Sequence, residues 1–587
     1  MTDFDAIVIG SGLGGSSATA HLAAVGKRVL MLERYSVLGG SSHVFRRQGQ
    51  WEFDCGVHYL GDCGPDGHIP TLMRGLGLDD RISWLPLDSD AFDTFRGPDL
   101  ELKVPVDWDA FEANLVDAFP HDARGLRQLV KVLRALSRDW NRDLTPASMA
   151  NQNRWLLGVG AAATFAYLPV VSLFLACRLS PRTIFTLGIY CGLLGSTPSK
   201  TTSTVYAVLL NLYIEGGAYF PRGGGQALSA AFAEVTTTHG GVIRRNTAVE
   251  KILVDNGKVR GVRLSGGEIV TAPAVVSAGD AIRTFTDLVD DEHIPVLYRR
   301  RVGALRMGLP FINAYFGVEL DLRSAPNGNI FVIPNWDDCK NLATLALTER
   351  RLFHGLRYGR GSGRDWAEQF AARGPTFVQS STRRDPDHHT SAPMGHGTLE
   401  VQSIVPHNPA MWGVDGYDVA KHGYRQDATY NDIKEILIEG MAQRIEVAYP
   451  GASSAIKFVE LGTPAAQERF VGNSSGAPFG LAPLASQTGA LRPGTKTPIE
   501  GLYLAGTNTP WGPATEGAML SGRHAASAVV GRDLGAEVRG GAVLADRSKL
   551  RPWPKNFDAL RAVSNELDTQ PDLAGTQHVF GVGGQHA

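Results

Sequence analysis

The segment DAIVIGSGLGGSSATAHLAAVGKRVLMLE, residues 5–33, decides the fold of the chain. Residues 5–10 have the pattern of a short buried strand, and a helix rich in small residues follows. A second strand over residues 28–33 ends on Glu33. Gly10, Gly12 and Gly15 form a GxGxxG pattern at the turn between the first strand and the helix. This order of strand, glycine turn, helix, strand and acid predicts a βαβ unit of a doubly wound α/β fold.

Each part of this unit has a mechanical reason. Gly10 permits the tight turn, Gly12 lets the backbone approach a pyrophosphate, and Gly15 lets the helix pack against the strand. The helix N-terminus offers unpaired N–H groups to the phosphates. Glu33, 18 residues beyond Gly15, is placed to accept a hydrogen bond from a ribose hydroxyl. The alternative is a glycine-rich turn that binds no ligand, and the complete pattern argues against it.

The composition indicates a large globular protein without a nucleic-acid partner. With 587 residues the chain can form two or more domains. Lys and Arg number 57 and Asp and Glu 59, so the net charge of -2 lacks the basic excess of a nucleic-acid-binding protein. The five cysteines are scattered and form no CxxC pair, which favours a reducing compartment. Because the first strand begins near residue 4, we expect no signal peptide and a cytoplasmic protein.

Residues 155–177 form a run without charge, flanked by Arg154 and Arg178. The run is long enough to span a bilayer, but it contains Gly158, Gly160 and Pro169. A second uncharged run covers residues 183–199. Three interpretations remain open, namely a spanning helix, a monotopic membrane patch and the buried wall of an apolar substrate cavity. The last two can both hold.

The pattern of elements divides the chain into interleaved parts. Short strands are expected at residues 241–244, 249–254, 259–264, 268–271 and 275–280, with hairpin turns at Asn256-Gly257 and Gly266-Gly267 and a helix at 227–235. We therefore expect a discontinuous nucleotide-binding domain made of residues 1–62, 219–300 and 481–535. Residues 63–218 and 301–480 would form a substrate- and membrane-associating domain. Residues 536–587 are a C-terminal extension without a clear pattern.

A second glycine turn lies in GLYLAGTNTPWGPATEGAMLSGRHAA, residues 501–526. Residues 502–505 have the pattern of a buried strand that ends at Gly506, and a helix should begin near Thr515 or Glu516. In a doubly wound fold a ligand lies across the carboxyl ends of the strands, so this turn can close over the far end of the cofactor. A helix N-terminus there would stabilise negative charge on a flavin ring. The alternative is an ordinary βα packing unit.

The motifs GSGLGG, LGGSS, FDCGVHYLG, YFPRGGGQAL and GLYLAGTNTPWGPATEGAMLSG together resemble the phytoene desaturase, carotenoid isomerase and retinol saturase superfamily of flavoproteins. The resemblance covers roughly residues 4–535, and the FDCGVHYLG segment is most similar to the all-trans-retinol 13,14-reductase branch. It implies a Rossmann-type FAD-binding domain, discontinuous in sequence, with an inserted α+β substrate domain. It also implies FAD as the cofactor.

The resemblance assigns cofactor contacts to two groups of residues. Those for the pyrophosphate and ribose are Gly10, Gly12, Gly14, Gly15, Glu33 and Arg34. Those for the flavin side are Gly40, Ser41, Ser42, Val249, Gly506, Glu516, Gly517 and Met519. One departure concerns Thr507, because relatives often have an acid directly after the glycine that matches Gly506. A contact to the ribityl chain at that position is therefore in doubt.

His58 and Tyr59 are the candidate catalytic residues, because the resemblance places their segment beneath the flavin and facing the substrate. Reducing an alkene needs a hydride on one carbon and a proton on the other, and either side chain could supply the proton. A packing role for His58 is an equal alternative. Glu516 could cap its helix or touch the flavin, and Arg222 could form a loop ion pair or face the flavin.

Other titratable clusters point less clearly to chemistry. His388, His389 and His396 occur near Asp385 and Asp387 in DPDHHTSAPMGHG, which has the residue types of a metal site. The same segment is rich in turn residues, which favours a solvated loop. No metal site is predicted.

These features predict an FAD-dependent oxidoreductase that acts on carbon–carbon double bonds of an apolar polyene or isoprenoid, similar to a retinoid or carotenoid. Saturation, desaturation and cis–trans isomerisation all remain open, as does the electron donor, NAD(P)H or another external one. The alternatives are an amine oxidase-like flavoenzyme and a non-catalytic lipid-binding protein of the GDP-dissociation-inhibitor type. We expect peripheral or monotopic association with a bilayer surface.

Overall fold

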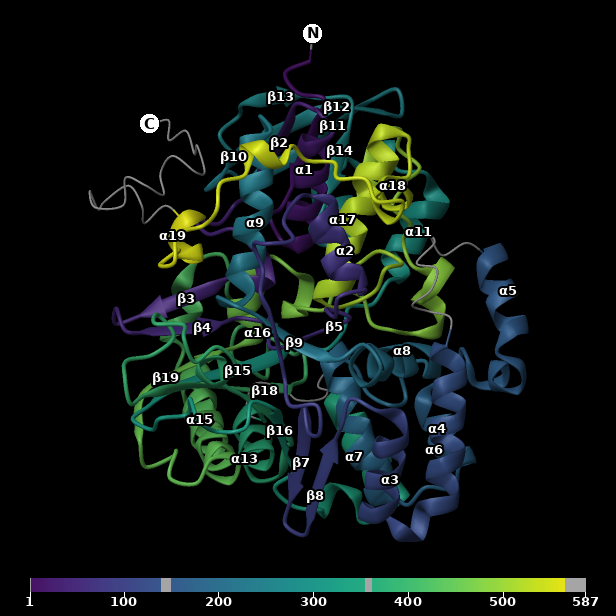
Figure 1. Ribbon diagram of the computed structural model, residues 1–587, viewed down its shortest axis with the longest axis vertical. Helices are drawn as coiled ribbons and strands as arrows, with labels where there is room; N and C mark the ends of the chain where they lie inside the picture. The colour runs from purple at the N-terminus through teal and green to yellow at the C-terminus, as the bar shows by residue number, and fades with distance from the viewer. Residues whose placement is uncertain (1, 139–148, 354–361, 565–587) are drawn as a thin grey trace.

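The computed structural model describes residues 2–138, 149–353 and 362–564, and it confirms the α/β fold (Figure 1). The strands in these ranges form a five-stranded sheet, a seven-stranded sheet and three smaller sheets. In Figure 1 the helices α1, α9 and α17 of the first sheet lie in the upper half. The seven-stranded sheet lies at lower left, and a group of helices that includes α3, α4 and α8 lies at lower right.

The five-stranded sheet is parallel throughout and is the predicted Rossmann-type core. Its strands are, in order, β10 (Val242–Arg244), β2 (Val29–Leu32), β1 (Ala6–Ile9), β14 (Val275–Ser277) and β20 (Leu502–Leu504). On one face Val8 and Val276 pack with helices α1 (Leu13–Ala24), α9 (Gly224–Thr238) and α17 (Thr515–Val530). A sheet covered on both faces is apolar at every position, which explains the continuous apolar runs in the sequence.

An antiparallel meander covers the other face of this sheet. It consists of β11 (Val249–Asp255), β12 (Lys258–Leu264) and β13 (Ile269–Thr271), whose apolar side chains pack against those of β1, β2 and β14. Asn256 and Gly257 both have positive φ, 51° and 74°, as a two-residue hairpin turn of the primed type requires. The strands and the first hairpin turn predicted for this region are confirmed.

Helix α9 begins three residues before the predicted position. Gly223 has a φ of 80°, and the N–H groups that follow it have carboxylate partners. The Gly223 N–H donates to Asp385 Oδ2 (2.8 Å) and the Gly225 N–H to Asp54 Oδ1 (2.8 Å). These two acids lie far away in the sequence, so the local pattern could not indicate that they satisfy the first N–H groups of the helix.

The seven-stranded sheet combines strands from both parts of the proposed substrate domain. Its order is β19 (Ile456–Gly462), β15 (Phe311–Val318), β18 (Gly397–Ile404), β17 (Thr376–Gln379), β16 (Asn329–Val332), β7 (Asp93–Gly97) and β8 (Leu100–Val104). One face is apolar and packs against α13 (Gly363–Arg373) and α15 (Ala428–Ala448). The opposite face includes Asn313, Tyr315 and Gln402, which border a cavity between this sheet and the parallel sheet.

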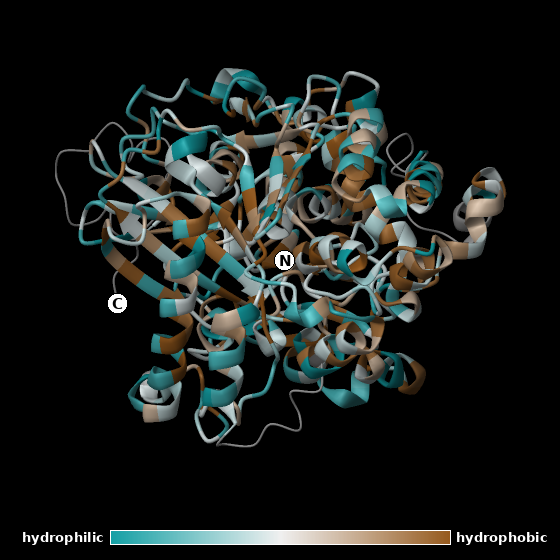
Figure 2. Ribbon diagram, turned by 90° about the horizontal axis from the view of Figure 1, so that it is seen from below, coloured by the Kyte–Doolittle hydropathy of each residue, from teal (hydrophilic) through white to brown (hydrophobic). Residues whose placement is uncertain are grey.

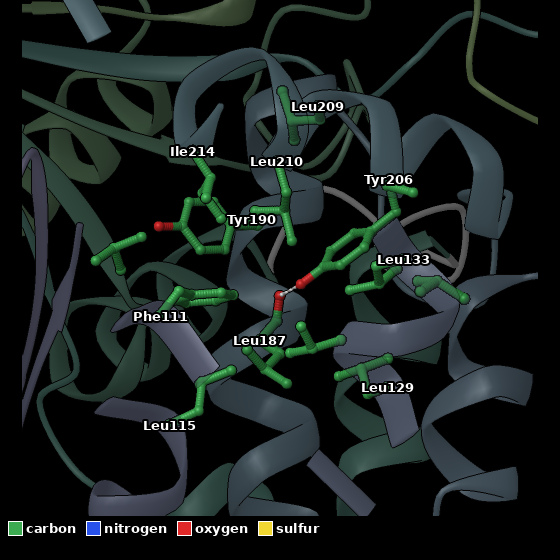
Figure 3. Close-up of a cluster of buried hydrophobic side chains, with 14 of the residues drawn as sticks. Phe111, Leu115, Leu129, Leu133, Leu187, Tyr190, Tyr206, Leu209, Leu210 and Ile214 are labelled. Carbon is green, nitrogen blue, oxygen red and sulfur yellow. Dashed lines mark hydrogen bonds between the residues drawn. The ribbon is translucent and has the colours of Figure 1, made fainter. Parts of the chain in front are cut away.

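Helices enclose the largest apolar cluster of the molecule (Figure 3). They are α3 (Trp108–Ala118), α4 (Ala123–Ser137), α6 (Val170–Ala176), α7 (Pro181–Gly188) and α8 (Ser203–Ile214). The Tyr206 hydroxyl donates to the Leu187 carbonyl (2.8 Å), which satisfies a polar group that is otherwise surrounded by leucines. In the view of Figure 2 the apolar segments lie mostly on interior strands and helices, while the outer loops are polar.

The uncharged run at residues 155–177 is divided among three helices. These are the end of α5 (Met149–Gly158), a 3-10 helix (Gly160–Phe165) and α6. Gly160, with a φ of 59°, and Pro169, the residue before α6, separate them. Over the residues that the structure describes, no helix combines the length and the hydropathy needed to cross a membrane.

The described part of the C-terminal extension packs back on the parallel-sheet half of the molecule. It contains α18 (Leu534–Arg539) and α19 (Ala559–Ala562). Asp558 binds Arg46 through two hydrogen bonds (2.7 and 2.9 Å), and the Leu38 N–H donates to the Val563 carbonyl. Residues 565–587 lie outside the described ranges.

Candidate active site at two adjoining cavities

A cavity of about 480 Å³ lies at the carboxyl ends of the parallel strands, where a doubly wound fold binds its ligand. Four of the predicted segments contribute to its lining. They are the first glycine turn with Gly10, Gly12 and Gly14, the acid Glu33, the loop with Gly40, Ser41 and Ser42, and the second glycine turn with Gly506. We call this space the cofactor cavity.

The first glycine turn has the geometry that a dinucleotide requires. Gly10 has a φ of 92°. A Cβ on Gly12 would meet no atom within 4 Å and would occupy space beside the cavity, at the residue that precedes α1. A Cβ on Gly15 would lie 2.0 Å from the Gly10 carbonyl oxygen, so Gly15 is needed for the close packing of α1 on β1. The open cradle at Gly12 and the N–H groups of α1 suit a pyrophosphate.

Glu33 lies at the end of β2 and borders the cavity. Its Oε2 accepts from the Ser11 N–H (2.9 Å) and hydroxyl (2.7 Å), and its Oε1 accepts from the Tyr35 N–H (2.8 Å). Arg34 does not border the cavity, and its guanidinium donates to the carbonyls of Glu468 and Arg469. Glu33 therefore joins the glycine turn to the loop after β2.

The loop with Gly40, Ser41 and Ser42 lies against the first glycine turn. Gly12 and Gly39 form an isolated parallel bridge, and a Cβ on Gly40 would lie 3.0 Å from the Gly12 Cα. Gly39 has a φ of 124°. The two glycine motifs thus form one surface of the cavity although 24 or more residues separate them in the sequence.

The second glycine turn closes the opposite side. Gly506 has a φ of 88° and borders the cavity together with Thr507. A Cβ on Gly14 would lie 2.7 Å from the Gly506 Cα, so the two turns are in direct contact. Helix α17 begins at Thr515, as predicted.

Three of the flavin-side residues lie behind the cavity wall. Glu516 is buried, and its Oε1 accepts from the Gly61 N–H (2.7 Å), while burial raises the pKa of Glu516 to about 7. A Cβ on Gly517 would lie 2.4 Å from the Trp511 carbonyl oxygen, and the Met519 carbonyl accepts from the Ser17 hydroxyl. Val249 begins β11 and likewise does not border the cavity.

His58 borders the cofactor cavity and contacts Gln402 of β18. The Gln402 amide donates to His58 Nε2, so the proton of the neutral imidazole lies on Nδ1, which has no partner among the described residues. Burial and, as a smaller contribution, the charge of Arg384 lower the pKa of His58 to about 3. His58 is therefore a neutral imidazole at pH 7.

Tyr59 lies outside the lining of both cavities. Its hydroxyl donates to Asp93 Oδ2 (3.3 Å), and its ring stacks on Tyr213 with the centroids 4.3 Å apart. Burial raises the pKa of Tyr59 well above its ordinary value, and the Asp93 charge raises it further. Tyr59 thus faces the seven-stranded sheet.

A second cavity of about 450 Å³ adjoins the first and has a predominantly apolar lining. Its walls include Val171, Ile184, Ile189, Leu193, Phe331 and Phe377. Both uncharged runs of the sequence contribute to it, through α6, α7 and the 3-10 helix at Ile189–Leu194. Phe311 and Gln402 border both cavities, so the two spaces meet beside His58. We call the second space the apolar cavity.

A buried polar row crosses the seven-stranded sheet behind this junction, and the sequence patterns did not indicate it. Glu400 and Gln402 occupy alternate positions of β18, and Glu400 accepts from Gln379 (2.5 Å) and from the Ser381 hydroxyl (3.3 Å). Arg384 donates to Gln379. Two acids in one strand would have indicated a buried polar row. The sequence of β18 at residues 399–404, LEVQSI, contains only one acid and one amide, so it does not indicate the row. Burial raises the pKa of Glu400.

Asp54 lies next to this row. Its Oδ2 accepts from the Ser381 hydroxyl (3.2 Å), and burial raises its pKa to about 7. The buried guanidinium of Arg384 interacts with the charges of both Asp54 and Glu400. Such a network fixes the strands that position His58 and Gln402.

The remaining candidate residues lie away from both cavities. Arg222 is half exposed and pairs with Asp387 (3.5 Å), which is the loop ion pair considered above. His388 Nε2 contacts the Thr390 hydroxyl (2.8 Å) and His389 is exposed. Among the described residues no three His, Cys, Asp or Glu side chains come together as a candidate metal site.

The comparison with protein families defines the class of this protein. The model of the family "flavin containing amine oxidoreductase" matches residues 13–296 and 465–530, more than half of the chain. The chain therefore belongs to this family of flavin-dependent oxidoreductases. The two matched ranges begin at residue 13, just after Gly12, and contain Gly14 and Gly15 of the first glycine turn and the whole of the second one at Gly506.

Comparison with curated proteins identifies more specific relatives within this family. The chain is 26% identical to the chloroplastic prolycopene isomerase 1 of an Oncidium hybrid cultivar, over 94% of this chain and 88% of the relative. It is 24% identical to the all-trans-retinol 13,14-reductase of Danio rerio, over 86% of this chain and 82% of the relative. The superfamily and the branch inferred from the motifs are confirmed.

Solved structures agree on the fold. Cyclohexylamine oxidase from Brevibacterium oxydans has a TM-score of 0.57 at 16% identity, covering 92% of this chain and all of that one. An oxidoreductase from Methanosarcina mazei has a TM-score of 0.55 at 18% identity, with 90% of this chain covered.

Proposed function

We propose that the protein is an FAD-dependent oxidoreductase that acts on carbon–carbon double bonds of an apolar polyene or isoprenoid, by saturation, desaturation or cis–trans isomerisation. The observation that carries this proposal is the contact between the two cavities at Phe311 and Gln402. An apolar molecule in the second cavity can reach the flavin end of the first. The names of the relatives, which act on prolycopene and retinol, support this class of substrate.

The cofactor cavity suits FAD in its charge and shape. We propose that the N–H groups at Gly12 and the start of α1 bind the pyrophosphate, and that Glu33 accepts from the ribose. The loop at Gly40 and the turn at Gly506 would enclose the flavin end. A bound FAD supplies hydride transfer to or from a carbon of the substrate. For saturation, NAD(P)H or another external donor would supply the two electrons, whereas desaturation would pass two electrons to an external acceptor and isomerisation would need no net electron transfer.

His58 is the group that we propose at the reacting bond, because it borders the cofactor cavity and carries an unpartnered N–H. Gln402 fixes its tautomer by donating to Nε2. The Nδ1–H would then orient a bound ligand or donate to it as negative charge develops on carbon. We propose that Tyr59, which is bonded to Asp93, supports this segment from behind.

We also propose a bilayer surface as the source of the substrate. The uncharged run carries three exposed apolar side chains, Leu157, Leu168 and Leu175. Leu175 and Leu342 both border the apolar cavity, and they are 47% and 49% exposed. A vesicle flotation assay tests this step. Leu157→Glu with Leu168→Glu should reduce flotation, whereas Val543→Glu, at an exposed site on the C-terminal extension, should not.

The experiment for the main proposal is product analysis under anaerobic conditions. The purified protein is incubated with all-trans-retinol or a cis-carotenoid and an electron donor, and the products are separated by mass spectrometry and chromatography. A saturated, desaturated or isomerised polyene supports the proposal and identifies the reaction. Oxidation of an added amine in a separate aerobic incubation, together with no polyene conversion, would instead favour the amine oxidase alternative. Polyene binding by a preparation without flavin would favour the lipid-binding alternative.

A further inference from the structure

The apolar cavity contains two buried hydroxyls that have no partner. Ser196 and Thr197 border the cavity and are only 1% and 4% exposed. Over the described residues neither Ser196 Oγ nor Thr197 Oγ1 makes a hydrogen bond. A buried hydroxyl without a partner is costly, so such groups in a ligand cavity indicate a polar atom of the ligand.

The backbone around these residues makes hydrogen bonds in which neither hydroxyl takes part. The Ser196 N–H donates to the Cys191 carbonyl, and the Thr197 carbonyl accepts from the N–H groups of Lys200 and Thr201. Gly195, with a φ of 58°, makes the turn that directs the next two side chains. The backbone therefore holds the loop in place without using either hydroxyl.

The loop begins on the side of the apolar cavity that adjoins the cofactor cavity. The Leu309 N–H donates to the Gly195 carbonyl (2.6 Å), and a Cβ on Gly195 would lie 3.6 Å from the ring of Phe479, which borders the cofactor cavity. The exposed residues Leu175 and Leu342 are at the outer side. A polar atom bound at Ser196 and Thr197 thus belongs to the part of the substrate nearer the cofactor.

We propose that Ser196 and Thr197 form a binding site for an oxygen atom of the substrate, so that the protein prefers an oxygen-bearing isoprenoid, an alcohol or a carbonyl compound, over the matching hydrocarbon. This inference rests on the proposed function and narrows its substrate class. The two hydroxyls can each donate and accept, so they recognise either a hydroxyl or a carbonyl oxygen.

A paired-ligand binding experiment tests the site. The flavin-loaded protein is titrated with all-trans-retinol and with the hydrocarbon analogue in which a methyl group replaces the hydroxymethyl group, and tryptophan fluorescence reports binding. We expect wild type to bind the alcohol about tenfold more tightly, the effect of one well-formed hydrogen bond. In the Ser196→Ala, Thr197→Val double variant the preference should disappear while affinity for the hydrocarbon is unchanged or higher.

Control variants make the outcome decisive. Thr202 has another buried hydroxyl without a partner and is close in the sequence, but it does not border the cavity. Thr202→Val should therefore leave the preference for the alcohol over the hydrocarbon intact. Equal affinities of wild type for the two ligands would overturn the proposal, because water would then satisfy the hydroxyls. Loss of the preference in Thr376→Val, whose hydroxyl also borders the cavity without a partner, but not in the double variant would overturn the assignment to Ser196 and Thr197. Absence of flavin, or of binding by either ligand, would contradict the proposed function itself.

Discussion

Gln402 borders both cavities, and its side-chain amide donates to Nε2 of His58. This single contact joins the seven-stranded sheet to the FDCGVHYLG segment at the point where the cofactor cavity meets the apolar cavity. It also determines that the imidazole proton lies on Nδ1. Because burial lowers the pKa of His58 to about 3, the ring remains neutral and acts as a hydrogen-bond donor at pH 7.

Gly12→Val should produce a folded protein without flavin. The added side chain meets no protein atom near its Cβ and extends into the space that we assign to the pyrophosphate. The ratio of flavin to protein absorbance measures occupancy. Gly266→Ala, at a glycine whose Cβ would also meet no atom but which lies in a turn away from the cavity, should keep full flavin. Full flavin in Gly12→Val would show that the phosphate site is elsewhere.

Glu516→Ala should destabilise the protein more than Glu516→Gln. The alanine leaves the Gly61 N–H without its acceptor, at a cost of about 1–3 kcal/mol, while the glutamine oxygen can still accept from it. The midpoint of thermal unfolding, measured with flavin content, checks this. If both variants unfold at the same temperature, the contact with Gly61 contributes nothing measurable and Glu516 has another role.

His58→Ala and Tyr59→Phe should differ in their effects on turnover. If His58 donates at the reacting bond, His58→Ala retains flavin and loses about 10²–10⁴-fold in turnover. Tyr59→Phe removes only the hydroxyl that is bonded to Asp93, so we expect a smaller loss. Steady-state rates with matched flavin content are the measurement. Normal turnover in both variants would exclude both residues as proton donors and would favour isomerisation without net reduction.

Asp54→Asn should change how stability depends on pH. Because burial raises the pKa of Asp54 to about 7, the folded protein holds a proton there that the unfolded chain releases above about pH 4. The stability of wild type therefore falls as pH rises through this window, and the variant lacks that contribution of a few kcal/mol. Thermal midpoints of both proteins on either side of the window give the difference. A constant difference across the window would mean that Asp54 is ionised throughout.

The nucleotide half of the fold could be predicted from the sequence because its signals are local. The glycine turn at Gly10–Gly15 and the start of α17 at Thr515 depend on neighbouring residues, and both are as expected. Helix α9 begins earlier than predicted because Asp54 and Asp385 satisfy its first N–H groups from other parts of the chain.

The junction of the two cavities could not be predicted in the same way. Gln402 approaches His58 from a strand 344 residues further along, and nothing near either residue indicates the other. Ser196 and Thr197 lie inside the second uncharged run, and the sequence alone is compatible with a spanning helix, a membrane patch or a cavity wall for these runs. The fold of the run around the apolar cavity depends on α12 (Leu342–Phe353) and β18, which are distant in the sequence.

The most direct test of the account is a titration of the flavin-loaded protein with a polyene, followed by the flavin absorbance spectrum. The account predicts a saturable change in the flavin spectrum of wild type, because one end of the bound polyene would lie beside the flavin. It predicts no such change in Gly192→Phe, whose new side chain would fill the apolar cavity without reaching the cofactor cavity, while flavin content stays the same. A polyene that binds wild type without altering the flavin spectrum, or that alters it equally in Gly192→Phe, would contradict the claim that the two cavities form one active site.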